Sequence, residues 1–157
     1  MEKIKKFEKI MAEATTMAFA TSVDNVPNVR ILNFIYSKDE KMLYFQSKKG
    51  DRKEKEFTKN NIIAFTTIPE NGLSYVRVSD TIVKKSIKTI YDVKNTFSEK
   101  MPFYKDFIEN NGDTMDLYEV HLSKVFLYLN PDEYEIIELW FILKQKNKIN
   151  GVRPHFV

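Results

Sequence analysis

The sequence predicts a mainly β protein of the α+β class, an antiparallel barrel with helices at its periphery. Two observations favour this class. About six segments alternate polar and apolar residues and follow one another through short turns, which is typical of antiparallel strands. Segments with helical spacing stand before or between these strands and are charged on one face. They are therefore expected to cover the barrel from outside.

The first half of the chain begins with a helix over residues 2–14. Ile4, Phe7 and Met11 recur there at helical spacing, with lysines and glutamates on the opposite face. Strand alternation then takes over and is interrupted by turns. The elements expected in this half are strands over 17–23, 28–36, 42–47 and 61–68, a helix over 51–59, and turns at 24–27 and 37–41.

The second half is predicted to contain strands over 73–84 and 115–129 and helices over 86–97 and 102–110. Pro102 stands at the start of the second of these helices, where proline is tolerated. The apolar run at 133–143 follows a break at Pro131 and fits either a strand or a short helix. Residues 1–145 are expected to form one domain, and residues 146–157 a C-terminal tail.

Composition limits the classes of protein to which the chain can belong. It has 157 residues, enough for one domain to bury a core without metals or disulfides, and it contains no cysteine. Thiolate nucleophiles and cysteine-held metal centres are therefore excluded, and the two histidines do not make a metal site by themselves. No apolar run approaches the about 20 residues of a membrane helix, so a cytoplasmic location is expected. The net charge of +3, with both signs interleaved, argues against a nucleic-acid partner.

Residues 43–57, LYFQSKKGDRKEKEF, combine a strand end, a glycine-containing loop and the start of a charged helix. This order brings backbone N–H groups, a hydroxyl and several cations to one place, as phosphate sites require. Arg30 is expected to join them if the strands over 28–36 and 42–47 pair as a hairpin. A guanidinium offers phosphate a planar, bidentate fork that an ammonium cannot reproduce. A phosphate site is therefore predicted here.

The strand over 28–36 is apolar on both faces. One face carries Val29, Ile31 and Ile35, and the other carries Leu32, Phe34 and Tyr36. A strand of this kind in a small barrel needs a cover on its outside, and a second copy of the chain is the expected cover. The sequence therefore predicts a homodimer with a ligand slot between the subunits.

The order of these features resembles the flavin-binding split barrels related to pyridoxamine 5′-phosphate oxidase. The features are the first helix, the PxVR-type strand, the LYF-x-S strand end, the glycine loop and the RK helix start. The resemblance covers roughly residues 5–85 and, more loosely, the strand at 115–129. It implies a six-stranded antiparallel split β-barrel of the FMN-binding type, with FMN at the interface of a homodimer.

The resemblance also implies which residues contact the FMN. Arg30 would contact the edge of the flavin ring or the phosphate. Ile31, Leu32 and Asn33 would line the ring. The polar pair at the FMN is Gln46 and Ser47, and the basic residues at its phosphate are Arg52 and Lys53, with Lys48 beside them. Tyr75 and Arg77 would reach the flavin from the same or the partner subunit. No catalytic side chain is expected, because the flavin supplies the redox chemistry.

Two departures from the family pattern are visible. Asp51 stands where the family often carries a small hydroxyl residue, and with Glu54 it is expected to cap its own helix and to compete with the phosphate. The vitamin-B6 enzymes have an arginine-rich C-terminal segment, whereas this chain offers only Arg153 and His155 there. The expectation is a related flavoprotein and not pyridoxamine phosphate oxidase itself.

Three functions are compatible with these features. The first is an FMN-dependent oxidoreductase that passes electrons from NAD(P)H to a small acceptor. The second is a flavin carrier or redox sensor without turnover. The third is a small β-barrel that binds single-stranded nucleic acid through aromatic side chains and nearby lysines, the aromatic candidates being Phe34, Tyr36, Tyr44 and Phe45.

Overall fold

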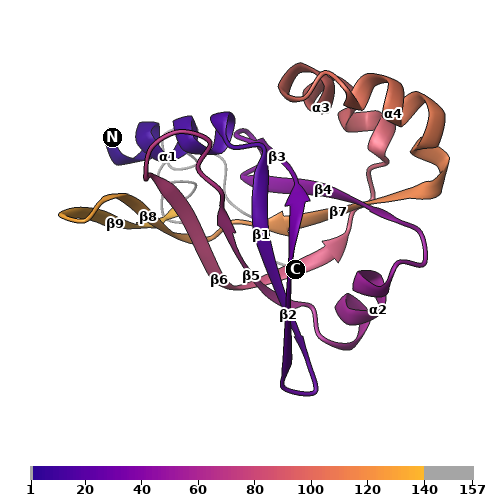
Figure 1. The fold of residues 1–157 in the computed structure, drawn as a ribbon, viewed down its shortest axis with the longest axis horizontal. Helices are drawn as coiled ribbons and strands as arrows, with labels where there is room; N and C mark the ends of the chain where they lie inside the picture. The colour runs from indigo at the N-terminus through magenta and orange to yellow at the C-terminus, as the bar shows by residue number, and fades with distance from the viewer. Residues whose placement is uncertain (1, 140–157) are drawn as a thin grey trace, which may run out of the picture.

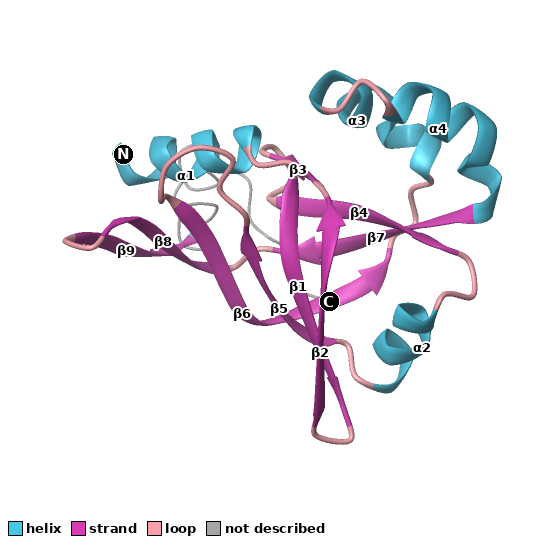
Figure 2. Ribbon diagram, viewed as in Figure 1, coloured by secondary structure: helices cyan, strands magenta, loops and turns pink. Residues whose placement is uncertain are grey.

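The computed structural model describes residues 2–139, which form a mainly antiparallel β structure curled into a half barrel, with helices at its margins (Figures 1 and 2). The strands are β1 (Thr16–Val23), β2 (Val26–Asn33), β3 (Ile35–Ser37), β4 (Met42–Lys48), β5 (Ile62–Thr67), β6 (Tyr75–Lys85), β7 (Met115–His121), β8 (Lys124–Asn130) and β9 (Glu133–Glu138). The helices are α1 (Glu2–Glu13), α2 (Arg52–Lys59), α3 (Lys94–Lys100) and α4 (Tyr104–Asn111), with 3-10 turns at Ile90–Val93 and Gly112–Thr114. The predicted split-barrel fold is confirmed.

The strands are hydrogen-bonded in the order β2-β1-β5-β6-β7-β4-β3, and β8 pairs with β6 and β9. The long strand β6 pairs with β5, β7 and β8, so it carries the sheet around the barrel. The strands β2 and β3 lie at the two ends of this order, although they are consecutive in the chain. No ladder joins β2 to β3 or β4 among residues 2–139, and we call this break in the hydrogen bonding the barrel split.

Several predicted boundaries were wrong. The single strand expected over 28–36 is broken at Phe34, because its first part pairs with β1 and its last part with β4. The break buries two consecutive side chains, Phe34 in the main core and Ile35 in a second cluster. The strand expected over 115–129 is likewise two strands, β7 and β8, separated at Leu122 and Ser123.

The structure also bears on the helix predicted over 86–97 and on the undecided run at 133–143. The helix predicted over 86–97 begins later, because Thr89 and Asp92 form a capping box that starts the 3-10 turn. The undecided run at 133–143 is the strand β9 as far as Glu138. The rest of that run and the tail at 146–157, with Arg153 and His155, lie outside the described residues.

Strand β4 separates two apolar clusters. Phe45 faces the main core, where its ring packs 5.1 Å from Phe19 and 5.7 Å from Tyr118 between ring centroids. Tyr44 faces the opposite way, into the cluster beneath α3 and α4 with Phe97. Figure 1 shows these two helices above the β4–β7 end of the sheet, while α1 lies across its other end. Residues on alternate sides of β4 therefore reach different parts of the molecule.

The outer face of the sheet is largely apolar, with Thr66 and Arg77 among its residues, and the described residues do not cover it. The strand register places Ile31, Ala18, Thr66, Arg77, Phe126 and Ile136 in one row across six strands. Val29 is 65% exposed and Ile31 is 58% exposed on this face. The sequence expectation of an outward apolar face is confirmed for these two residues.

None of the helices between residues 2 and 139 is both long and apolar enough to cross a bilayer.

Replacing Tyr36 by phenylalanine should raise the free energy of unfolding by roughly 1 kcal/mol. The Tyr36 ring packs edge-on against Phe7 beneath α1, and its buried hydroxyl has no hydrogen-bond partner among the described residues. Burial raises the pKa of this hydroxyl. Urea denaturation measures the change, and Tyr104→Phe is the control, since the Tyr104 hydroxyl accepts a hydrogen bond from Gln46. A loss of stability in Tyr36→Phe equal to that in the control would contradict the prediction.

Candidate functional site

The N-terminus of α2 follows a glycine turn at the end of β4. Gly50 has a φ of +77°, which glycine adopts without strain, and the Asp51 N–H then donates to the Lys48 carbonyl oxygen (3.0 Å). Asp51 Oδ1 accepts from the Lys53 N–H (3.0 Å), and Glu54 Oε2 accepts from the Gly50 N–H (2.8 Å). The predicted capping role of Asp51 is confirmed. The cap occupies a backbone donor that an incoming anion would otherwise use.

A buried polar group, which we call the arginine–glutamate cluster, joins α2 to the β1–β2 hairpin. It consists of Thr21, Asn28, Arg30 and Glu56. Glu56 Oε2 accepts from Arg30 Nη2 (2.6 Å) and from the Thr21 hydroxyl (2.7 Å), and Glu56 Oε1 accepts from Asn28 Nδ2 (3.2 Å). The side chains of Arg30 and Glu56 are only 20% and 11% exposed, so the pair is largely shielded from water.

The electrostatics of the cluster favour the ionised carboxylate. Burial alone would raise the pKa of Glu56, but hydrogen bonds from Thr21, Arg30 and Asn28 outweigh it and hold the pKa below the usual value. The hydrogen bond from the Lys53 N–H, the Lys53 ammonium and the nearby Arg30 guanidinium likewise lower the pKa of Asp51. Arg30 therefore lies close enough to the α2 N-terminus for its charge to act there.

Arg30 reaches this place by a route that differs from the predicted one. A hairpin between its strand and residues 42–47 was expected. Instead β2 pairs with β1, and only β3 pairs with β4. Helix α2 packs against the β1–β2 hairpin, and Glu56 from that helix holds the guanidinium. The predicted convergence of Arg30 with the α2 N-terminus is present, but a helix produces it and not a strand ladder.

One edge of the Arg30 guanidinium is buried and unsatisfied. Its Nη1 atom has no hydrogen-bond partner among the described residues, although it is inaccessible to solvent. Buried guanidinium nitrogens normally donate to an acceptor, because an unmet donor costs about 1–3 kcal/mol. An anionic oxygen is the acceptor that suits it best. The donor set here thus fits a phosphorylated cofactor.

The other predicted phosphate residues surround the same helix start. Ser47 is fully buried on the main-core face of β4, and its hydroxyl donates weakly to the Lys48 carbonyl oxygen (3.3 Å). The Lys53 ammonium pairs with Asp51 Oδ2 (3.1 Å). The Arg52 side chain is 86% exposed, with its Nε 3.4 Å from Glu56 Oε1, and Lys48 is exposed. Arg52 and Lys53 therefore each contact a carboxylate, and a bound phosphate would have to compete with these carboxylates for them.

An open cavity of about 500 Å³ adjoins this group between α2 and the tip of the β1–β2 hairpin. Arg52, Lys55 and Lys59 line it from the helix, together with Thr21, Asn28 and Glu56 of the arginine–glutamate cluster. The cavity gives solvent and small anions access to the exposed side of the arginine–glutamate cluster.

The residues predicted at the flavin ring divide between two places. Asn33 Nδ2 lies 3.1 Å from the Met101 sulfur, and Gln46 Nε2 donates to the Tyr104 hydroxyl (3.4 Å). Both polar residues thus meet the turn between α3 and α4, beside the barrel split. Leu32 packs against the main core on the Arg30 face of β2, whereas Ile31 points to the outer face of the sheet.

Tyr75 and Arg77 lie on the outer face of the sheet. The Tyr75 ring stacks on Tyr128 with centroids 4.8 Å apart, and the Arg77 guanidinium lies 4.6 Å from the centroid of the Phe126 ring. Strands β1 and β5 separate them from Arg30 within one chain. The structure therefore does not bring these two residues to the rest of the predicted site.

Three residues of the site were missed by the sequence analysis: Glu56, Met101 and Tyr104. Glu56 is spaced four residues from Arg52, a pattern that also occurs on solvated helix faces, and its position beside Phe57 was the available signal of burial. Met101 and Tyr104 are distant in sequence from the strands they meet, and no local pattern indicated the contact.

The aromatic platform for nucleic acid is contradicted by the structure. Phe34, Tyr44 and Phe45 are buried in the two apolar clusters, and Tyr36 packs against Phe7. Rings in these positions cannot stack on nucleotide bases.

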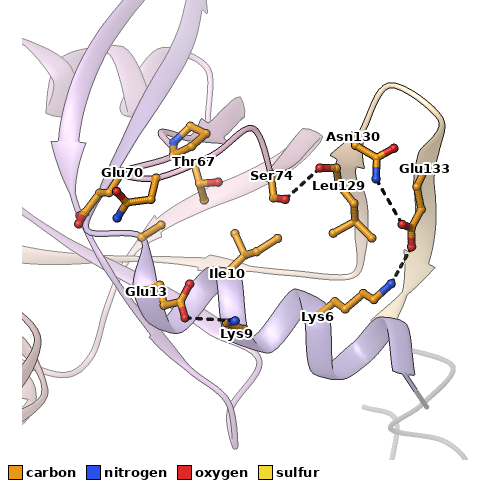
Figure 3. A pocket seen from close by; sticks show the side chains of 13 residues that line it. Lys6, Lys9, Ile10, Glu13, Thr67, Glu70, Ser74, Leu129, Asn130 and Glu133 are labelled. Atoms are coloured by element: carbon orange, nitrogen blue, oxygen red, sulfur yellow. Dashed lines mark hydrogen bonds and ion pairs between the residues drawn. The ribbon is translucent and has the colours of Figure 1, made fainter.

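A second cavity, of about 680 Å³, lies at the other end of the barrel between α1, the β5–β6 loop and the β8–β9 hairpin (Figure 3). Figure 3 shows its polar side chains largely paired with one another, as in the contact between Lys6 and Glu133 (2.6 Å). The hydroxyl of Ser74 donates to the Leu129 carbonyl oxygen (3.0 Å). None of the predicted site residues lines this cavity.

Comparison with known proteins agrees with the observed fold. The family model described as pyridoxamine 5′-phosphate oxidase-like matches residues 10–130. The chain therefore belongs to the pyridoxamine 5′-phosphate oxidase-like family. No curated protein sequence matches it.

Solved structures of low sequence identity share the fold. ChuZ from Campylobacter jejuni has a TM-score of 0.72 at 12% identity; the match covers 87% of this chain and 59% of that one. General Stress Protein 26 from Bacillus anthracis has a TM-score of 0.66 at 15% identity, with 88% and 99% covered. A protein from Mesorhizobium loti, described as FAD-binding, has a TM-score of 0.57 at 16% identity, with 86% and 94% covered.

Proposed function

We propose that this protein binds FMN at the barrel split, with the phosphate at the start of α2. The observation that carries the proposal is the buried Arg30 Nη1, a charged donor without a partner among the described residues. Membership of the pyridoxamine 5′-phosphate oxidase-like family supports a flavin, as does the similarity to a protein described as FAD-binding.

The chain's own residues would hold the phosphate by charge and hydrogen bonding. A phosphate near neutral pH carries about −1.5 to −2 charge. Residues 48–56 carry five cations (Lys48, Lys49, Arg52, Lys53 and Lys55) and three carboxylates (Asp51, Glu54 and Glu56), and the Arg30 guanidinium contacts Glu56. Arg30 Nη1 and the Ser47 hydroxyl are the buried donors, and Arg52 is free to turn toward the ligand because it is exposed.

The ring end would lie nearer the turn between α3 and α4. Asn33 and Gln46 offer amide donors to polar ring atoms there, and Leu32 offers an apolar side chain on the Arg30 face of β2. When bound, FMN supplies the redox chemistry, and the proposed reaction is electron transfer from NAD(P)H to a small acceptor. A carrier or redox sensor would use the same residues without turnover.

The outer face of the sheet supports a homodimer as part of the proposal. The occupant would be a second copy of the chain, because the row that includes Ile31 continues across β1, β5, β6, β8 and β9, and Val29 is exposed on the same face of β2. Apolar sheet faces of this extent are normally covered. Tyr75 and Arg77 would then approach the partner's flavin.

The test compares FMN with riboflavin, which lacks only the phosphate. Titration of the full chain, followed by the quenching of flavin fluorescence, should give an affinity for FMN at least about tenfold greater than for riboflavin, the effect of one charge-assisted hydrogen bond. Equal affinities, or no binding of either flavin, would defeat the proposal. Steady oxidation of NADH or NADPH by the FMN-loaded protein would then favour the oxidoreductase over the carrier.

Replacing Asp51 by serine should tighten FMN binding roughly fivefold, the effect of about 1 kcal/mol that a partly exposed ion pair contributes. Serine retains the helix cap, releases Lys53 from its 3.1 Å contact with Asp51, and removes a negative charge near the phosphate. The FMN titration measures the change. Asp51→Ala is the control, because it removes the same charge together with the cap. Weaker binding in Asp51→Ser than in the wild type would contradict this prediction.

A further inference from the structure

Glu56 occupies an unusual position for a carboxylate beside a phosphate site. Its two oxygens face donors from three elements: Thr21 on β1, Asn28 and Arg30 on β2, and Arg52 on its own helix. These contacts use its acceptor capacity, so Glu56 has no role left as a proton donor or acceptor toward a ligand. Its effect on the site must pass through the groups that it holds.

We propose that Glu56 is a positioning residue that aims Arg30 at the cofactor phosphate. This inference rests on the proposed function. Glu56 holds the Nη2 edge of the guanidinium at 2.6 Å, and the Nη1 edge is left buried and without a partner among the described residues. The carboxylate does not itself touch the cofactor.

Two opposing effects follow from such a carboxylate, and they predict opposite results. Its negative charge repels a phosphate, so a simple count of charges predicts tighter FMN binding once Glu56 is neutralised. Its hydrogen bonds hold a long, flexible side chain in one conformation before the ligand arrives, which lowers the entropy lost on binding. Because Glu56 is buried and the 2.6 Å contact is short, we expect the second effect to dominate.

Glutamine cannot replace Glu56 in this role, although it has the same shape. A carboxylate accepts at both oxygens, whereas an amide has one acceptor oxygen and an NH2 group that only donates. Asn28 can turn its amide so that Oδ1 accepts from that NH2 group, but the Arg52 guanidinium near the same oxygen only donates. Arg30 Nη2 then keeps a neutral amide oxygen in place of a charged one. With the charge attraction gone, Arg30 is held less firmly in its orientation.

The experiment measures FMN and riboflavin affinities for Glu56→Gln in the full chain, at a temperature at which circular dichroism shows each variant folded. The control is Glu13→Gln, which removes one exposed negative charge on α1. Glu56→Gln should bind FMN about tenfold more weakly, with riboflavin affinity and the control unchanged, as expected when one charge-assisted hydrogen bond is lost. FMN binding as tight as or tighter than in the wild type would overturn the inference. Equal weakening of both flavins would also overturn it, because that result indicates a purely structural role.

If Glu56→Gln does not fold, Thr21→Val provides the test. This variant keeps the shape of the side chain and the Arg30–Glu56 charge pair, but it removes the hydroxyl that donates to Glu56 (2.7 Å) and accepts more weakly from Arg30 Nη2 (3.3 Å). Looser anchoring of the carboxylate should reduce FMN affinity about threefold, with riboflavin unchanged, the loss expected for a neutral hydrogen bond. An unchanged FMN affinity would then overturn the inference. A wild-type protein that does not prefer FMN over riboflavin would defeat the proposed function instead, so the two failures are distinguishable.

Discussion

Replacing Arg30 by methionine should lower the free energy of unfolding by about 3 kcal/mol, the lower end of the cost of breaking a buried ion pair. The substitution leaves the Glu56 carboxylate, which is 11% exposed, with only the exposed Arg52 guanidinium as a cation, at 3.4 Å. The hydrogen bonds from Thr21 and Asn28 remain, but they do not neutralise the charge. Urea denaturation measures the loss. FMN titration of the folded variant should show that the preference for FMN over riboflavin has largely disappeared.

The double variant Arg30→Met with Glu56→Leu is the matched control for stability. It removes both charges, and apolar replacements of buried ion pairs are often neutral or stabilising. The double variant should therefore recover most of the stability that Arg30→Met loses, without recovering the FMN preference. A loss below about 1 kcal/mol in Arg30→Met would mean that the pair is effectively solvated, as exposed ion pairs are.

Replacing Arg52 and Lys53 together by alanine should weaken FMN binding by roughly 10- to 100-fold, since charge-assisted hydrogen bonds contribute about 1.5–3 kcal/mol each. The effect on folding should be small. Arg52 is 86% exposed, and its contact with Glu56 at 3.4 Å is an i,i+4 pair on a helix surface, which contributes only about 0.3–0.5 kcal/mol. This variant is thus expected to lose FMN affinity while keeping its stability, whereas Arg30→Met is expected to lose both.

Lys55→Ala with Lys59→Ala is the control for this second prediction. It removes two exposed cations from the same helix, and both line the adjoining cavity without belonging to the predicted phosphate residues. Its FMN affinity should change by less than about threefold at 0.15 M salt, because salt screens exposed charges that make no direct contact with the phosphate. An equal loss in both double variants would show that FMN senses only the general positive charge of α2.

The sequence predicted those parts of the molecule whose signals are local. The period of the apolar residues located α1, α2 and β4 within one residue of their observed ends, and the order of strand, glycine turn and Asp51 cap was correct. Alternation alone did not reveal that the strand over 28–36 changes partner at Phe34. Both halves are apolar and extended, and the break depends on the position of β4, which is not encoded nearby.

The candidate site shows the same division between local and distant information. Residue types suited to phosphate identified Arg30, Arg52 and Lys53, but the cause of their convergence lay in Glu56, which resembled an ordinary charge on a solvated helix. The contacts of Asn33 with Met101 and of Gln46 with Tyr104 span 68 and 58 residues of sequence, so only the folded chain reveals them. The resemblance placed Tyr75 and Arg77 at the same flavin as Arg30, but in the fold β1 and β5 lie between them within one chain.

A crystal structure of the protein grown with FMN tests the central claim most directly. We expect the phosphate to lie within about 3 Å of Arg30 Nη1, with the Ser47 hydroxyl and the α2 basic pair also in hydrogen-bond range. Glu56 should still hold the Nη2 edge of the guanidinium. A flavin phosphate bound elsewhere, with Arg30 Nη1 still unsatisfied or turned to a protein acceptor, would contradict the account.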